Sequence, residues 1–287
     1  MIYTTEIDKE FLATRLLVRK DDSHKGDYGH LLIVAGCETM PGAAVLATGA
    51  ALKSGCGLVT LHSTVRALQA CVVNWPSAML SENPGALFSE LPRDGIGRYN
   101  AIAAGPGLGK KPETKAALLE LLEAARSRSI PCVLDADALN ILSENPAWQE
   151  LVPVGSVLTP HEGELGRLFP ACPGEGQDET ISAFCGKSGS TLIRKGYHSR
   201  VYLPDGECFR NTSGNPGMAK GGSGDVLTGL VGGLLSRGYT GKDAALLGVW
   251  IHGHAGDVLT ADHSAEAYNS RDLIDRLDCG FYLLYNQ

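Results

Sequence analysis

The sequence predicts an α/β fold in which a mainly parallel central sheet carries helices on both faces. Short apolar runs alternate with segments of helical periodicity along most of the chain, which is typical of successive βαβ units. The apolar runs are continuous, as in strands that are buried on both faces. Glycines or polar residues follow several of these runs. We find no linker, composition break or internal repeat, so residues 1–287 are expected to form a single domain.

The first half of the chain supplies the opening strands. Residues 1–28 are polar and are expected to be partly irregular. An apolar run at 31–35 ends at Gly36 and predicts the first buried strand. Pro41-Gly42 opens a helix that runs to residue 52, and its many small residues favour close backbone packing. Further along, we expect a strand at 58–61, a helix at 65–73, a strand at 100–104 and an amphipathic helix at 114–128.

The second half continues the alternation. Strands are expected at 132–135, 157–160 and 191–194, and a helix starts at His161. Residues 200–210 are expected to form a hairpin around the turn residues Pro204-Asp205-Gly206. The remaining predicted elements are a helix that follows the glycine-rich stretch 221–225, an apolar helix at 244–260 and a closing helix at about 270–277.

Composition excludes several functional classes. The net charge is −7 and there is no basic run, so we expect no nucleic-acid partner. No apolar run is long enough to span a bilayer, and the first residues lack the pattern of a signal peptide. The eight cysteines include no C-x-x-C pair, which argues against zinc and favours free thiols in a reducing cytoplasm.

A glycine-rich stretch at 221–225 precedes apolar residues at helical spacing. It predicts a loop that leads into a helix N-terminus, where unpaired amides and a partial positive charge favour phosphate. Asp225 is unexpected there, because a carboxylate repels phosphate unless it takes a proton from a substrate hydroxyl. The alternative is that Asp225 or Ser223 merely caps a core helix.

Polar residues also follow the ends of the predicted strands. In an open parallel sheet, ligands bind beyond the carboxyl ends of the strands. Asp135 and Asp137 are placed there, although the two can also be a pair of helix caps. The other candidates at this edge are the glycine turn after residue 104, His161 with Glu164, Lys195 with Gly196, and Asp225.

Three apparent motifs do not hold. Gly109-Lys110 and Gly186-Lys187-Ser188 resemble parts of a P-loop, but the required first glycine is absent in both. No dinucleotide fingerprint follows the first strand either. His252 and His254 suggest a metal pair, but no third ligand is evident, so histidines buried in a core helix are favoured.

Together, six segments resemble the ADP-dependent (S)-NAD(P)H-hydrate dehydratases of the ribokinase-like superfamily, in the stand-alone form without an epimerase domain. The combination of a Thr-Pro-His-x-x-Glu segment with the glycine loop carries most of this resemblance. The segments, in family order, are residues 24–29, 55–60, 105–109, 135–140, 158–164 and 214–225.

This resemblance implies a hydro-lyase that repairs nicotinamide cofactors. Such an enzyme removes water from the S form of hydrated NADH or NADPH at the expense of ADP, with magnesium present. Phosphoryl transfer to the ring hydroxyl precedes elimination of phosphate, and AMP remains. The resemblance assigns Asp225 as the catalytic residue that accepts the hydroxyl proton. It assigns the amides around Gly222, Ser223 and Gly224 as the anion hole.

The resemblance also assigns binding residues. Ala43, Gly107, His161 and Asp225 would contact the hydrate, and Glu164 would organise magnesium through water. The implied nucleotide-binding residues are Lys195, Gly196, Tyr197, His198, Ser199 and Gly224. Relatives in this superfamily often form tetramers, so a homo-oligomer is expected.

Three departures and two other functions remain open. Lys220 and Ser223 stand where many relatives carry threonine. Lys220 either helps to hold phosphate or faces solvent, and we favour solvent because lysine is rarely buried. Ser77 stands where relatives often carry glutamate. One alternative is a kinase of the same superfamily that phosphorylates a vitamin-precursor alcohol. The other is a non-catalytic nucleotide-binding protein, against which Asp225 argues.

Overall fold

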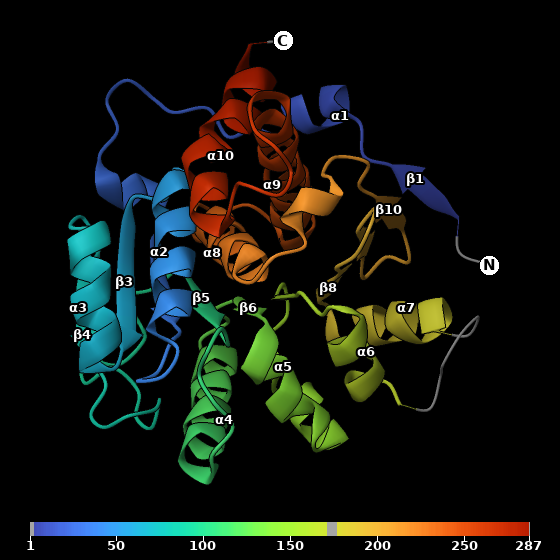
Figure 1. Ribbon diagram of the computed structural model, residues 1–287. Helices are drawn as coiled ribbons and strands as arrows, with labels where there is room; N and C mark the ends of the chain where they lie inside the picture. The colour runs from blue at the N-terminus through green and yellow to red at the C-terminus, as the bar shows by residue number, and fades with distance from the viewer. Residues whose placement is uncertain (1–2, 171–176, 287) are drawn as a thin grey trace.

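The computed structural model describes residues 3–170 and 177–286, and its described strands form one ten-stranded sheet (Figure 1). Their order across the sheet is β1-β10-β9-β8-β7-β6-β5-β2-β3-β4. The strands are β1 (Thr4–Glu6), β2 (His30–Val34), β3 (Leu58–Ser63), β4 (Met79–Glu82), β5 (Ala101–Ala104), β6 (Cys132–Leu134), β7 (Val157–Leu158), β8 (Thr191–Arg194), β9 (Arg200–Tyr202) and β10 (Cys208–Arg210).

Parallel pairing joins the strands from β4 to β8, which confirms the predicted mainly parallel sheet. β9 is antiparallel to both β8 and β10, so the predicted hairpin at 200–210 is also confirmed. Its turn forms because Gly206 adopts a φ of 87° and the Asp205 carboxylate accepts the Glu207 amide.

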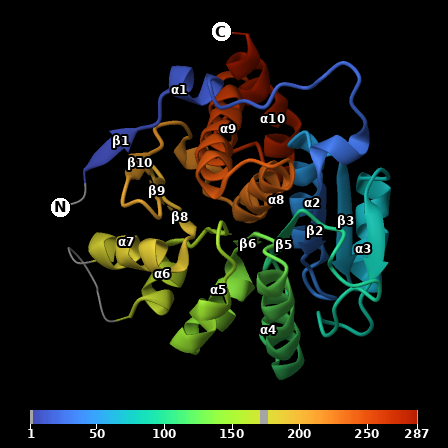
Figure 2. The same cartoon turned by 180° about the vertical axis from the view of Figure 1, so that it is seen from behind.

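Helices cover both faces of the sheet (Figures 1 and 2). α2 (Pro41–Lys53), α3 (Val65–Asn74), α8 (Ser223–Ser236), α9 (Gly241–Asp262) and α10 (Ser270–Tyr285) lie on one face. The opposite face carries α4 (Pro112–Ser127), α5 (Ala136–Ser143), α6 (Glu162–Leu168) and α7 (Gln177–Ser188). α1 (Lys9–Ala13) packs against α10. In the described part of the chain, no helix is both long and apolar enough to cross a membrane.

The central strands contribute side chains to two separate cores. In β2, Leu31 and Ile33 join the core under α8, while Leu32 and Val34 join the core under α4. Alternate residues of a strand point to opposite faces, so a strand covered on both sides must be apolar throughout. This is why the central strands are continuous apolar runs in the sequence.

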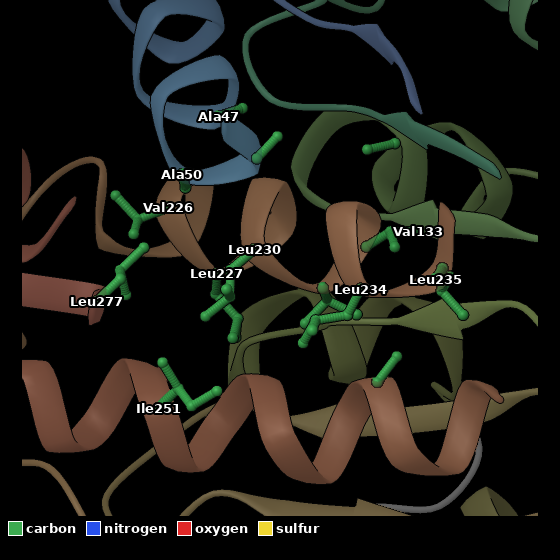
Figure 3. Packing of buried hydrophobic residues seen from close by; sticks show 14 of the residues in the cluster. Ala47, Ala50, Val133, Val226, Leu227, Leu230, Leu234, Leu235, Ile251 and Leu277 are labelled. Carbon is green, nitrogen blue, oxygen red and sulfur yellow. The ribbon is translucent and has the colours of Figure 1, made fainter. Parts of the chain in front are cut away.

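α8 is the central helix of its layer and lies between α2 and α9 (Figure 3). Its apolar residues, among them Val226, Leu230 and Leu234, are fully buried. The close approach of α2 depends on glycine, because a Cβ at Gly229 would lie 1.9 Å from the Ala47 carbonyl oxygen. The predicted close packing of the small residues in α2 is therefore confirmed.

Several elements were not predicted. β4 is an edge strand whose Met79 and Leu80 are 42% and 43% exposed, so it lacks the apolar run of a central strand. β1, α1, α5 and α7 are also additional, and α10 continues to Tyr285 instead of ending near residue 277. β1, α1 and the added turns of α10 lie near the ends of the chain, and α5 has only eight residues, so their pattern in the sequence is weak. α7 is longer, but only three of its twelve residues are buried, so it carries no clear apolar stripe.

Candidate active site

A cavity of about 860 Å³ lies at the carboxyl ends of the central strands, beside the N-terminus of α8. Segments far apart in the sequence meet there, namely the ends of β6 and β8, the start of α6, and the loop before α8. The cavity is lined by ten of the residues expected to form the site: His161, Glu164, Lys195, Gly196, Tyr197, His198, Ser199, Ser223, Gly224 and Asp225.

The N-terminus of α8 presents its first amides to this cavity. Gly222 is the N-cap and adopts a left-handed φ of 91°, and a Cβ at this residue would lie 2.4 Å from Leu46 Cδ1. The Ser223 amide donates to the Lys220 carbonyl, at 3.3 Å. The amides of Gly224 and Asp225 belong to the first turn and have no carbonyl partner within the helix. This end of α8 is therefore suited to hold an anion.

Asp225 lines the cavity from the third position of α8. Burial raises the pKa of its carboxyl to about 7, the negative charge of Asp135 adds to the rise, and the Lys195 ammonium opposes it. A carboxyl group with this pKa can accept a proton near neutral pH. Among the described residues, no hydrogen bond joins the Asp225 carboxylate to its N-cap amide, so the capping interpretation is wrong for Asp225.

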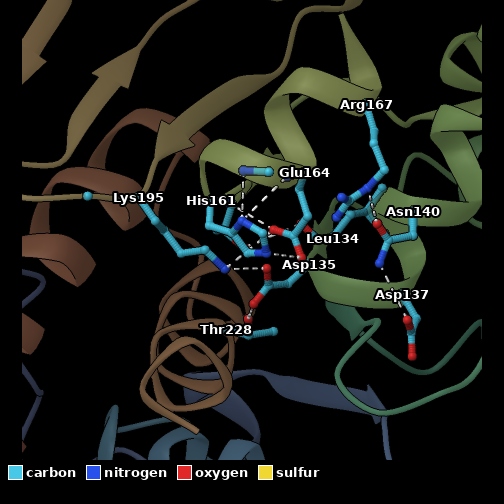
Figure 4. A network of polar contacts seen from close by, with 12 residues as sticks. Leu134, Asp135, Asp137, Asn140, His161, Glu164, Arg167, Lys195 and Thr228 are labelled. Atoms are coloured by element: carbon cyan, nitrogen blue, oxygen red, sulfur yellow. Dashed lines mark hydrogen bonds and ion pairs between the residues drawn. The ribbon is translucent and has the colours of Figure 1, made fainter. Parts of the chain in front are cut away.

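Asp135 connects Lys195 to α8 (Figure 4). The Lys195 ammonium lies 2.6 Å from Asp135 Oδ1, and the Thr228 hydroxyl donates to Asp135 Oδ2 at 2.7 Å. Asp135 is almost fully buried. A Cβ at Gly224 would lie 3.2 Å from Lys195 Nζ, so the ammonium is next to the open end of α8. The network supplies a positive charge where an anion would bind.

His161 and Glu164 form the N-terminus of α6. His161 Nδ1 accepts the amides of Gly163 and Glu164, at 3.0 and 3.4 Å, and the His161 amide donates to Glu164 Oε2 at 2.9 Å. Glu164 Oε1 lies 3.3 Å from His161 Nε2, and Lys195 Nζ lies 3.9 Å from Glu164 Oε2. The cap engages Glu164 Oε2 and the His161 ring faces Oε1, so the Glu164 carboxylate is held in place by its own helix.

One wall of the cavity is the loop between β8 and β9. Tyr197 is 80% exposed, and its ring centroid lies 3.9 Å from that of His198. His198 has a φ of 56°, which is uncommon for a residue other than glycine. Ser199 Oγ donates to the Gly196 carbonyl and closes the loop. The loop offers an exposed aromatic ring beside the cavity.

Ala43 and Gly107 lie elsewhere at the same edge of the sheet. Both are buried, and a Cβ at Gly107 would lie 3.0 Å from Ala43 Cβ and 3.1 Å from Met40 Cβ. Neither residue is among those that line the cavity, and Gly222 is not among them either. The contact of Ala43 and Gly107 with the hydrate stays a prediction.

Lys220 does not face solvent as expected, so that prediction is wrong. Its Nζ donates to the main-chain carbonyls of Ala265, at 2.7 Å, and Tyr268. Asp137 also has a structural role, since its carboxylate accepts the Gly109 amide at 2.8 Å. Of the two strand-end acids, only Asp135 lines the cavity.

His252 is buried in α9, which confirms the histidine of a buried helix that the sequence favoured, and it also lines the cavity. Its Nε2 lies 3.4 Å from Ser223 Oγ, and burial lowers the pKa of its ring to about 4. His254 instead stacks on Trp250. Other lining residues that we did not predict include Asn211, Asn215 and Met218. All three lie in residues 211–220, directly before the glycine loop, and this position is the sequence feature that could have identified them.

No metal cluster is built from protein side chains alone in the described parts of the chain. Across residues 3–170 and 177–286, no three His, Cys, Asp or Glu side chains are arranged to hold an ion. Magnesium commonly binds with most of its ligands from water and substrate phosphates. Glu164 and Asp135 supply carboxylate oxygens at the cavity, which suits that second mode of binding.

Known proteins match the chain over most of its length. Residues 31–278 match the family model of the NAD(P)H-hydrate dehydratases. An ADP-dependent (S)-NAD(P)H-hydrate dehydratase of Neisseria meningitidis is 38% identical, over 84% of this chain and 80% of that protein. The ADP/ATP-dependent NAD(P)H-hydrate dehydratase of Bacillus subtilis, co-crystallized with ATP and Mg²⁺, is 30% identical with a TM-score of 0.83. That match covers 98% of this chain and 99% of the Bacillus chain.

Two further comparisons concern the fold and the length of the relatives. A ribokinase-like superfamily protein of Enterococcus faecalis is 24% identical with a TM-score of 0.83, over 99% of this chain and 97% of that one. At that identity the match concerns the fold alone, and it agrees with the predicted ribokinase-like architecture. The chain spans about half the length of several other curated relatives that it matches.

Proposed function

The chain belongs to the NAD(P)H-hydrate dehydratase family, and we propose that it dehydrates the S form of hydrated NADH and NADPH at the expense of ADP. The products would be NADH or NADPH, AMP and inorganic phosphate. The observation that carries this proposal is Asp225, a carboxyl with a pKa of about 7 on the first turn of α8, beside open amides and the Lys195 ammonium.

The first step of the proposed reaction is phosphoryl transfer. Asp225 accepts the proton of the ring hydroxyl, whose oxygen attacks the β-phosphorus of ADP while the bond to AMP breaks. Of the predicted anion-hole amides, that of Gly224 would face the charge on the transferring group together with the Asp225 amide, because the Ser223 amide already donates to the Lys220 carbonyl and Gly222 does not line the cavity. In the second step phosphate leaves the ring, and loss of a proton from the neighbouring ring carbon restores the double bond.

The adenine nucleotide would occupy the remainder of the cavity. Lys195 is held beside α8 by Asp135 and fits a role at the phosphates. Gly196, Tyr197, His198 and Ser199 form the wall at which we propose that AMP binds. Leu227, Val249 and Met218 also line the cavity and add apolar surface that suits a flat base.

Magnesium fits this site as an ion held chiefly by nucleotide phosphates and water. Its chemistry would be to neutralise charge on the phosphoryl oxygens. Glu164 is already hydrogen-bonded to His161 and lies near Lys195, so we propose that it orients water around the ion.

The test combines purified protein, ADP, magnesium and hydrated NADH. We expect ADP-dependent recovery of the absorbance of the reduced ring, with one AMP and one phosphate released per NADH restored. No recovery with either ADP or ATP contradicts the proposal. A stable phosphorylated product without phosphate release indicates the superfamily kinase instead.

Three coarser expectations belong to this proposal. We infer a cytoplasmic location, since the seven described cysteines are free thiols and five of them are buried. A single domain over residues 1–287 agrees with the continuous ten-stranded sheet. Assembly into a homo-oligomer, such as a tetramer, stays a prediction that sedimentation or light scattering can test.

A further inference from the structure

Lys220 lies two residues before the N-cap of α8 and is among the residues that line the cavity. A lysine in this place suggests a phosphate ligand. Its ammonium group is engaged elsewhere, however, because it donates to the main-chain carbonyls of Ala265, at 2.7 Å, and Tyr268. It also lies 4.4 Å from the centroid of the Tyr268 ring. Two carbonyl dipoles and an aromatic face together form a site for a cation.

These carbonyls belong to the connection between α9 and α10, residues 263–269. Two more hydrogen bonds join this part of the chain to the segment before α8. The Tyr268 hydroxyl donates to Asn215 Oδ1 at 2.8 Å, and the Ser270 hydroxyl donates to the Gly221 carbonyl at 2.7 Å. The connection and the first residue of α10 thus hold the segment 215–222, and among the contacts made by Lys220, Tyr268 and Ser270 only that of Lys220 involves a charged group.

Lys220 is linked to the open end of α8 through its main chain. The Lys220 carbonyl accepts the Ser223 amide, and Gly222 between them is held in the left-handed region. A shift of Lys220 would therefore move the first amides of the helix. Amides that stabilise a transition state act only if they are held in place before the reaction, so a displacement of about 1 Å can slow it as much as ~100-fold.

We propose that Lys220 is a positioning residue, which holds the phosphate-binding end of α8 in place by binding two carbonyls of the 263–269 connection. It does not contact phosphate itself. A phosphate contact would require the ammonium to leave both carbonyls and the Tyr268 ring. This inference rests on the proposed function, because it takes the anion at α8 to be a nucleotide phosphate.

Amide hydrogen exchange without nucleotide separates the two roles. In Lys220→Met, which keeps the aliphatic stem and removes the charge, we expect residues 219–224 to exchange ~10-fold faster. A lost phosphate ligand would leave this exchange unchanged in the absence of nucleotide. With ADP and hydrated NADH, kcat/KM should fall ~10–100-fold, because the displaced amides no longer hydrogen-bond the transferring phosphoryl group in the transition state.

A second variant asks whether the vacated site takes a cation from solution. In Lys220→Ala, methylammonium chloride should slow exchange at 219–224 and restore several-fold of the lost kcat/KM. Tetramethylammonium chloride, which cannot donate hydrogen bonds, should do neither and controls for ionic strength. Lys53→Met, an exposed lysine at the end of α2, is the matched control and should behave as the parent protein.

The outcomes separate this inference from the proposed function. Unchanged exchange in Lys220→Met overturns the positioning role, whatever happens to activity. Parent-like activity of Lys220→Met in an active enzyme overturns it as well. If the parent protein shows no ADP-dependent recovery, the proposed function fails, while the exchange measurements still decide whether Lys220 orders the end of α8.

Discussion

Two of the helices that begin at the cavity, α6 and α8, carry an acidic residue at the same position of the first turn. In α6, Glu164 folds back onto the His161 amide and His161 accepts two amides in return. In α8, the N-cap is Gly222, which has no side chain for such a cap, and Asp225 lines the cavity. One N-terminus is closed by its own side chains, and the other is open to a ligand.

The difference does not follow from residue type alone. Asp272 of α10 also stands at the third position, and its carboxylate accepts its N-cap amide in the usual reciprocal cap. The N-caps of α6 and α10 have extended backbones, whereas Gly222 has a φ of 91°. The left-handed glycine changes the direction of the chain at the cap. A capping sequence pattern therefore becomes a reactive site when the N-cap backbone is reversed.

The largest expected effect tests the open helix directly. Asp225→Asn keeps the shape of the side chain and removes its ability to accept a proton. We expect kcat for ADP-dependent dehydration to fall by ~10²–10⁴-fold, as is usual for loss of a general base. Steady-state kinetics measure this, with AMP binding by calorimetry as the control for folding. A variant as active as the parent would show that the Asp225 carboxylate is not the proton acceptor.

The next effect concerns the reversed cap. Gly222→Ala adds a Cβ that would lie 2.4 Å from Leu46 Cδ1 and demands a left-handed φ from alanine. We expect ADP affinity and kcat/KM to fall ~10–100-fold, since the helix amides are displaced. Gly221→Ala is the matched control, because it has no positive φ and its Cβ would meet no atom within 4 Å. Equal losses in the two variants would contradict the importance of the left-handed residue.

A smaller effect is expected at the closed helix. His161→Asn retains a side-chain acceptor for the cap, while His161→Ala loses it, so only alanine should lower the free energy of unfolding, by about 1 kcal/mol. If His161 also contacts the hydrate, both variants should raise the KM for the hydrate by ~3–10-fold. Thermal unfolding and kinetics read the two roles separately. If His161→Asn has the KM of the parent, His161 acts only as a helix cap.

The smallest effect is a dependence of stability on pH. The folded-state pKa of Asp225 is raised from 3.8 to about 7, so the folded protein binds more protons than the unfolded chain between these values. The contribution of Asp225 to stability is therefore lost as pH rises from about 4 to 7. Asp225→Asn should equal the parent near pH 4. At pH 8 its free energy of unfolding should exceed that of the parent by about 1–2 kcal/mol after solvent screening, which raises Tm by ~2–3 °C in a chain of 287 residues. A difference that is constant with pH would contradict the raised pKa.

Sequence patterns predicted the central layers well because burial on both faces makes each strand an uninterrupted apolar run. Residues 31–34 are such a run, and the structure divides them between two cores. The hairpin followed from Pro204-Asp205-Gly206, since its turn conformation depends on local residue chemistry. β4 was missed because its surroundings, and not its composition, place it at the edge of the sheet.

The candidate site was predicted as a set of strand ends and a glycine loop, and ten of its residues do meet at one cavity. What the residues do within it was harder to predict. Lys220 was expected in solvent and binds carbonyls 45 and 48 residues away in sequence. His252 lies 29 residues from the hydroxyl of Ser223 that it approaches. Contacts between such distant segments leave no periodic signal in the sequence.

The sequence by itself determined the alternation of strands and helices, because this depends on local periodicity. Residue type alone also placed a glycine, which can adopt a positive φ, at 222 and a carboxylate at 225. Only the tertiary structure decided which of two similar helix ends stays open. It buries Asp225 near Asp135 and Lys195, which raises the pKa of Asp225, and it brings residues 263–269 behind the glycine loop. Burial and charge act through distances in space, and only the folded chain sets those distances.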